Sequence, residues 1–328
     1  MRVPLWIWLA TAAGVLALLA LSFFTHIRNA HEPSTKEAGA WTAFFVVLSI
    51  LFGIGLTLVW GVDHGIEYFA GYITEYSLSI DNLFVFVIIM AGFDVPRAYQ
   101  QTVLLIGIVI ALVLRTIFIL IGAAAIAHFS WVFYLFGLFL IATGIKLGFG
   151  KGDEGGDYEP NIMVRLARRV LPVTEHYDGT KLTTRIDGKR YVTPMLMVML
   201  AIGMTDILFA LDSIPAIYGL TDQPYIVFTA NAFALLGLIE LYFLIGGLLT
   251  KLVYLSLGLA LVLCFIGVKL VLEAMHTNSL PFINGGEPIP GIPEIPTWLS
   301  LLVIIGILAA TTIASLIKSR AGRASPGA

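Results

Sequence analysis

Two segments of the sequence place pairs of carboxylates inside long apolar runs. In each segment, five residues separate one acid from a second acid, and an amide or hydroxyl side chain follows at once. An ionised carboxylate at the centre of a bilayer costs about 2.5–3.5 kcal/mol on insertion scales, so such residues face a cavity or a partner. Carboxylate, amide and hydroxyl oxygens suit hard cations such as Mg²⁺, Ca²⁺ and Mn²⁺. The candidate ligands of a divalent cation are therefore Glu75, Asp81, Asn82, Asp206, Asp212 and Ser213.

The spacing of these residues limits how they can act together. Residues seven apart on a helix share a face, whereas residues six apart differ by about 120°. Glu75 and Asp81 therefore bind one ion together only if the helix is locally unwound. In the second segment Pro215 follows Asp212 by three residues, which predicts a break in that helix at Ser213–Pro215.

Three further polar residues lie inside apolar runs. We expect Arg115 to pair with a carboxylate, either as a structural counter-ion or as the charge that keeps the empty site neutral. Asn231 either forms a hydrogen bond between helices or belongs to the site, and Glu240 adds a fifth acid. One divalent cation does not neutralise four carboxylates, so Arg115 or protons must balance the excess. The alternative is that the acids only lock helices together through Arg115 and Lys269.

The composition identifies the elements that must position these residues. Only 12% of the 328 residues are charged and 59% are hydrophobic, whereas a soluble domain carries roughly 25% charged residues. A bilayer-spanning helix needs about 20 apolar residues. The sequence therefore predicts an all-α polytopic membrane protein. Nine runs are long enough: 3–24, 40–60, 68–92, 101–127, 130–148, 192–219, 224–249, 253–275 and 297–317.

The basic residues between these runs predict the orientation. Fifteen Lys and Arg residues fall in the odd-numbered connections and the C-terminal tail, while Arg2 alone falls on the other side. By the positive-inside rule, the N-terminus lies outside and the C-terminus in the cytoplasm. We therefore expect a multi-pass protein of the cytoplasmic membrane in contact with the lipid bilayer.

The two acidic segments also indicate an internal repeat. The motif in the third run recurs 131 residues later in the sixth, and Gly144-Ile-Lys-Leu in the fifth run resembles Gly267-Val-Lys-Leu in the eighth. A unit of three spans is odd, so the second copy must be inverted relative to the first. An inverted 3+3 helix repeat is typical of secondary transporters, which hold substrate between the two units.

These features divide the chain into five regions. The only long polar connection contains a short helix candidate near 161–170 and a hairpin signal around Asp187-Gly188. The regions are an N-terminal helix and short cytoplasmic loop (1–39), a second helix with the first repeat unit (40–148, repeat 68–148), a polar cytoplasmic loop (149–191), the inverted repeat unit (192–275), and an outer Pro/Gly loop with the last helix and a basic tail (276–328).

Several functional classes are excluded or lack support. A net charge of −2 provides no basic excess for binding nucleic acid. The single cysteine, Cys264, excludes an intrachain disulfide. No phosphate-binding loop, nucleophile elbow or dinucleotide fingerprint is present, so we expect no enzyme and no resident cofactor. The oligomeric state is not predicted.

At these residues the sequence resembles the TerC family of integral membrane proteins, in particular its Alx-like, manganese-associated branch. The likeness covers about 40–275 and rests on Tyr72–Phe86, Leu114–Ile117, Tyr191–Leu196, Asp206–Ile217 and Asn231–Leu238. It implies manganese export or homeostasis, with a metal site at the six acidic-motif positions. The family name reflects tellurium resistance.

One departure from the family pattern concerns the charge balance. Where the family often carries Gly-Leu-Arg, this sequence reads Gly237-Leu-Ile239-Glu240, so an arginine is lost and a carboxylate gained. The leading hypothesis is a transporter that exports Mn²⁺ or another divalent cation, with protons as the coupling ion. The alternatives are a membrane partner protein that assists insertion or metalation of other proteins, and a tellurite-resistance-associated membrane protein.

Overall fold

A computed structural model describes most of the chain. The described residues are 1, 3–24, 34–129, 131–149, 164, 169, 171–174, 176–186, 189–245, 254–278, 280 and 283–323. The backbone of Asp81 and Asp212 is helical, but their side chains lie outside the description. The helix candidate near 161–170 falls almost wholly outside these residues.

The described chain is helical apart from one hairpin and the connections. The helices are α1 (Leu5–Ser22), α2 (Thr35–Trp60), α3 (Val62–Gly92), α4 (Arg97–His128), α5 (Val132–Phe149), α7 (Pro194–Tyr218), α8 (Pro224–Leu236), α9 (Leu238–Ile245), α10 (Leu255–His276) and α11 (Thr297–Arg323), with a short 3-10 turn, η3 (Asn284–Gly286). Within the described residues, nine helical stretches are long and apolar enough to cross a membrane, with α8 and α9 counting as one. The predicted all-α polytopic fold class is confirmed.

Local sequence signals explain several helix ends. Ser34 caps α2 by accepting a hydrogen bond from the Glu37 backbone N–H at 3.2 Å. Gly61, with φ of 102°, separates α2 from α3. Pro194 and Pro224 begin α7 and α8, where a missing N–H costs no helical hydrogen bond.

The predicted break in the sixth span is wrong. Helix α7 continues through Pro215 to Tyr218, so this proline removes the backbone hydrogen bond to the Leu211 carbonyl without ending the helix. The interruption falls instead in the seventh span, where Gly237 takes φ −93° and ψ 6° between α8 and α9.

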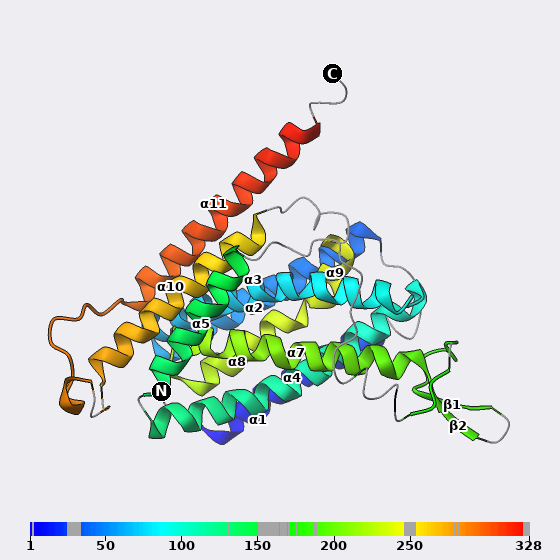
Figure 1. The fold of residues 1–328 in the computed structure, drawn as a ribbon, viewed down its shortest axis with the longest axis horizontal. Coiled ribbons are helices and arrows are strands. Elements are labelled where there is room, and N and C mark those ends of the chain that lie inside the picture. The colour runs from blue at the N-terminus through cyan, green and yellow to red at the C-terminus, as the bar shows by residue number, and fades with distance from the viewer. Residues whose placement is uncertain are drawn as a thin grey trace.

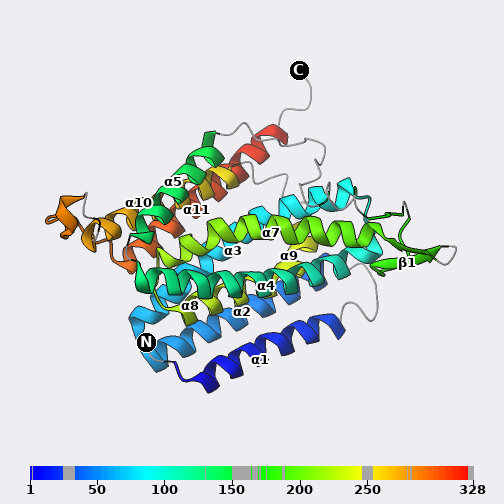
Figure 2. The same ribbon diagram turned by 60° about the horizontal axis from the view of Figure 1, so that its bottom comes forward.

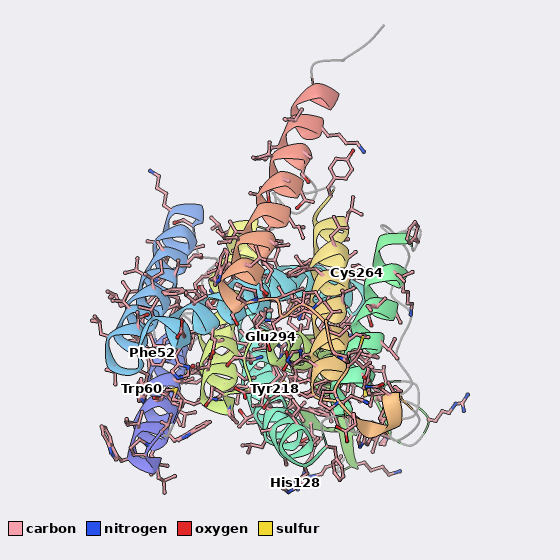
Figure 3. All side chains as sticks on the ribbon, turned by 90° about the vertical axis from the view of Figure 1, so that its left-hand side faces the viewer. Phe52, Trp60, His128, Tyr218, Cys264 and Glu294 are labelled. Carbon is pink, nitrogen blue, oxygen red and sulfur yellow. The ribbon has the colours of Figure 1, made fainter. Side chains whose placement is uncertain are left out.

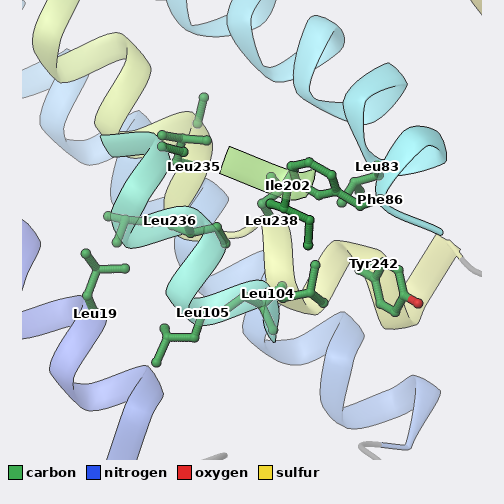
Figure 4. Close-up of a cluster of buried hydrophobic side chains, with 14 of the residues drawn as sticks. Leu19, Leu83, Phe86, Leu104, Leu105, Ile202, Leu235, Leu236, Leu238 and Tyr242 are labelled. Carbon is green, nitrogen blue, oxygen red and sulfur yellow. The ribbon is translucent and has the colours of Figure 1, made fainter. Parts of the chain in front are cut away.

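The helices form a main bundle with a second group at an angle to it. In Figure 1, α1–α4 and α7–α9 run roughly lengthwise, while α5, α10 and α11 rise diagonally together. Figure 2 shows the same separation, with α1 at the periphery on the far side from α5, α10 and α11. Helix α8 is central, and all of its residues from 225 to 236 are buried. Side chains from α1, α3, α4, α7, α8 and α9 meet in the main apolar core (Figure 4).

The predicted hairpin is confirmed by its strands, β1 (Thr183–Ile186) and β2 (Lys189–Val192). They pair antiparallel with Ile186 opposite Lys189, which leaves the two predicted turn residues between them, outside the description. The hairpin projects from one end of the bundle, which we call the hairpin end, and η3 lies at the opposite end, the η3 end (Figure 1).

Tyr177 anchors the segment before the hairpin to the C-terminal end of α3 by a hydrogen bond. The Tyr177 hydroxyl donates to the Phe93 carbonyl at 2.8 Å, beside a cavity of about 610 Å³ that Asp94 and His176 also line. Burial and the neighbouring Asp94 carboxylate raise the pKa of Tyr177 to about 12, so the hydroxyl remains a donor at neutral pH.

Replacing Tyr177 with phenylalanine is therefore expected to loosen this segment. The loss of one hydrogen bond costs about 0.5–1.5 kcal/mol. Amide hydrogen exchange across 171–193 should accelerate. Tyr134→Phe removes a hydroxyl that bonds Asn278 at the η3 end and should leave exchange in this segment unchanged. Equal exchange in the two variants would contradict the anchoring role.

Candidate functional site

Arg115 of α4 lies at the centre of a buried polar cluster, which we call the Arg115 network. The guanidinium forms an ion pair with Glu75 of α3, and its Nη2 donates to Asp206 Oδ1 of α7 at 3.1 Å. Its Nη1 also donates to Ser213 Oγ at 3.4 Å. Arg115, Glu75 and Asp206 are at most 2% exposed. The expectation that Arg115 pairs with carboxylates is confirmed, and it pairs with one from each acidic segment.

Asn82 completes this network from α3. Its amide satisfies two partners in one orientation only: the oxygen accepts from Arg115 Nη2 at 3.3 Å, and the nitrogen donates to the Leu78 carbonyl at 3.1 Å. Glu75 and Asn82 are seven residues apart and face the same guanidinium, as the helical spacing predicts. Four of the six predicted ligands therefore converge on Arg115.

The described part of the Arg115 network carries more negative than positive charge, and some of its acceptor oxygens have no hydrogen-bond partner. Two carboxylates share a single guanidinium, and neither Glu75 Oε2 nor Asp206 Oδ2 has a hydrogen-bond partner among the described residues. The hydroxyl of Thr74, the residue before Glu75, is also buried without a hydrogen-bond partner among the described residues. A buried acceptor without a partner is costly, so these oxygens would be stabilised by a proton, a water or a cation.

Asn231 of α8 is a further buried polar residue, on a helix that packs against α3. It is 1% exposed, and neither its amide oxygen nor its nitrogen has a hydrogen-bond partner in the described part of the chain. Its neighbour Ala230 packs 3.3 Å from where a Cβ on Gly71 would lie, and Gly71 is one helical turn before Glu75. The hydrogen bond between helices that Asn231 could have formed is not found in these residues, and its part in the site remains a prediction.

The metal-binding role of the six residues remains a prediction. Among the described residues, no group of three or more His, Cys, Asp and Glu side chains lies close enough to hold a metal ion. The side chains of Asp81 and Asp212 lie outside that set. Their backbones immediately precede Asn82 and Ser213, which both reach Arg115.

Two charged residues lie apart from the network. Glu240 of α9 accepts a hydrogen bond from Ser22 of α1 at 3.3 Å, a contact between distant segments that no sequence pattern indicated. Lys269 lies at the η3 end, where its electrostatic neighbours are Glu273 and Glu67. Of the motif acids whose side chains the structure describes, Glu75 and Asp206 pair with Arg115 and not with Lys269.

A second cavity of about 610 Å³ opens at the η3 end. Its lining includes Glu67, Tyr218, Asp222, Lys269 and Glu273. Figure 3 looks onto this end, with Tyr218 near the middle of the bundle. Glu67 is eight residues before Glu75 on α3, or about 12 Å along the helix. The cavity is therefore about two helical turns from Glu75 along α3, and no described residue of the Arg115 network lines it.

These features define the class of protein: a polytopic helical membrane protein with an ion-pair network buried between its spans. The model of the TerC family of integral membrane proteins matches residues 60–323, and the chain belongs to this family.

Several curated relatives match along nearly the whole chain. An uncharacterized membrane protein of Mycobacterium tuberculosis H37Rv is 50% identical over 321 residues, which cover 97% of this chain and 80% of the relative. One of Myxococcus xanthus is 43% identical and covers 96% and 93%. Alx of Escherichia coli K12, described as a proposed membrane-bound redox modulator, is 35% identical and covers 94% and 93%. No solved structure matches significantly.

Proposed function

We propose that this protein exports a divalent metal cation, with Mn²⁺ as the leading substrate, across the cytoplasmic membrane. The observation that carries the proposal is the Arg115 network, which joins three spanning helices and leaves carboxylate oxygens of Glu75 and Asp206 without partners. Hard oxygen donors of this kind suit Mn²⁺. The choice of manganese and the outward direction rest on the family resemblance.

The packing of the helices supports two inverted units. Helix α3 packs extensively on α8, and α4 packs extensively on α7, as expected if α3 corresponds to α7 and α4 to α8. Helices α5 and α10 meet reciprocally: a Cβ on Gly137 would contact the Gly267 carbonyl, and a Cβ on Gly267 the Gly137 carbonyl. These glycines are 130 residues apart, close to the 131 that separate the acids.

In this mechanism the positive charge of Arg115 substitutes for that of the cation. Its guanidinium offsets part of the charge of Glu75 and Asp206 when the site is empty. Asp81 and Asp212 are the core ligands, and Glu75 and Asp206 become partners or proton sites as the cation displaces Arg115. The cavities at the two ends of the bundle are the proposed routes of entry and release, with the hairpin end in the cytoplasm.

A thiol-based redox role receives no support from this chain. Thiol–disulfide exchange within one chain needs two cysteines, and the sequence contains only Cys264. A membrane partner protein that uses its acids structurally remains the competing class, because an ion-paired network also fixes helices together.

The direct test is Mn²⁺ flux in liposomes containing the purified full chain. Asp81→Asn and Asp212→Asn remove one charge each and are expected to slow flux by at least about tenfold. Glu294→Gln changes an exposed loop acid and should leave flux unchanged. Unchanged flux in both aspartate variants would exclude this mechanism. A wild-type protein that moves no divalent cation, yet copurifies with translocation machinery, would favour the partner protein.

A further inference from the structure

Glu240 is a buried acid that the Arg115 network does not use. Its side chain is 2% exposed. Oε1 accepts from the Ser22 hydroxyl at 3.3 Å, and Oε2 has no hydrogen-bond partner among the described residues. Ser22 ends α1 and Glu240 lies in the first turn of α9, so the contact joins the first span to the interrupted seventh span.

The surroundings of Glu240 are apolar. Its neighbours on α9, Leu238 and Tyr242, belong to the buried apolar cluster, together with Leu19 of α1 and Leu104 of α4 (Figure 4). The Tyr242 hydroxyl donates to Gln100 and therefore does not satisfy Glu240 Oε2.

The titratable and charged groups on the helices packed against α9 provide little compensation. Helix α3 contributes Tyr76, which lies within electrostatic reach of Glu240. Helix α2 carries Lys36 and Glu37 in its first turn, with Lys36 exposed. Helix α4 contributes Arg115, which is already paired with two other carboxylates. Helix α8 carries no Asp, Glu, Lys, Arg or His. No salt bridge reaches Glu240 from any described Lys, Arg or His.

An ionised carboxylate buried without a cation is strongly disfavoured, whereas the neutral acid is tolerated when hydrogen-bonded. We propose that Glu240 is a proton-binding site, separate from the Arg115 network. The carboxyl holds one proton at neutral pH and uses its remaining oxygen to accept from Ser22.

The coupling role of this site rests on the proposed transport function. Loss of the proton from Glu240 adds one negative charge to the low-dielectric interior, which strengthens binding of a divalent cation at the network. Binding of the cation must then favour proton release by the same factor. Glu240 is therefore the group through which a proton gradient drives cation movement.

The protonation state can be tested without transport. Infrared spectra of the purified full chain in lipid should contain the C=O stretch of a buried protonated carboxyl at neutral pH. We expect Glu240→Gln to remove this band, and Ser22→Ala, which deletes the donor, to shift it to higher frequency. Glu273→Gln, in the cavity at the η3 end, should leave it in place. A band that neither Glu240→Gln nor Ser22→Ala alters would overturn the proposal.

Coupling is tested separately, with Mn²⁺ as the probe and an imposed pH gradient across liposomes. In wild type the gradient should accelerate flux, and in Glu240→Gln the flux should no longer respond to it. If Glu240→Gln keeps the full response, the coupling role is overturned. If wild type moves no Mn²⁺ but retains the infrared band that Glu240→Gln removes, the transport proposal fails and the proton site stands.

Discussion

Replacing Arg115 with methionine is expected to destabilise the folded protein by about 3–5 kcal/mol and to abolish cation flux. The substitution leaves Glu75 and Asp206 buried without their cation, and removing one partner of a buried ion pair costs about this much. All three side chains are almost fully buried, so solvent cannot screen the uncompensated charges. Thermal unfolding in detergent, followed by tryptophan fluorescence, measures the loss.

The matched controls separate charge from packing. Lys146→Met removes an exposed base near the end of α5 and should change stability little. Arg115→Lys keeps the charge but loses the planar fork that reaches two carboxylates, so we expect an intermediate loss. Adding Glu75→Gln and Asp206→Asn to Arg115→Met should restore most of the stability. An Arg115→Met protein as stable as Lys146→Met would contradict the network's role.

Replacing Gly137 with alanine is expected to destabilise the protein by about 1–3 kcal/mol, and replacement by leucine by more. A Cβ on Gly137 would lie 2.7 Å from the Gly267 carbonyl oxygen and 3.0 Å from the Val271 nitrogen. These contacts are backbone atoms, which cannot rotate away, so α5 and α10 must separate. The reciprocal substitution Gly267→Ala meets the Gly137 carbonyl at 2.8 Å and should cost a similar amount.

Two other helical glycines serve as controls for this prediction. Gly55 in α2 and Gly306 in α11 have no atom within 4 Å of an added Cβ. Alanine there should be neutral or stabilise by up to about 1 kcal/mol, because alanine has the higher helix propensity. Unfolding temperatures of the four alanine variants make the comparison. A Gly137→Ala protein that matches Gly306→Ala would show that the two helices are free to move apart.

The spanning helices and the hairpin were predictable because their signals are local. A long apolar run must form backbone hydrogen bonds within itself in a bilayer, so its length and hydropathy define a helix. The hairpin follows from turn residues between two short strand-forming segments. Pro215 misled the prediction because a proline can stay inside a helix at the cost of one backbone hydrogen bond, and whether the helix continues depends on its packing.

The repeat shows that a local sequence match does not define which helix faces pack together. The sequence match makes Gly144 and Gly267 equivalent positions without predicting which glycines touch. In the structure Gly267 meets Gly137, and Gly144 packs on Ala260 and Cys264. Small residues occur often in spanning helices, so a short glycine-containing match does not define which faces meet. The way in which α5 crosses α10 determines which glycines are in contact.

The sequence alone identified the charged residues that lie within the spans, because charges are too costly in hydrocarbon to occur there without a partner or a cavity. It indicated that Arg115 must form an ion pair with a carboxylate. Only the tertiary structure decided that Arg115 meets Glu75 and Asp206 together with Asn82, and that Glu240 lies apart against Ser22. The reason is that helical periodicity gives the face on which a side chain lies, whereas its partner depends on how distant helices pack.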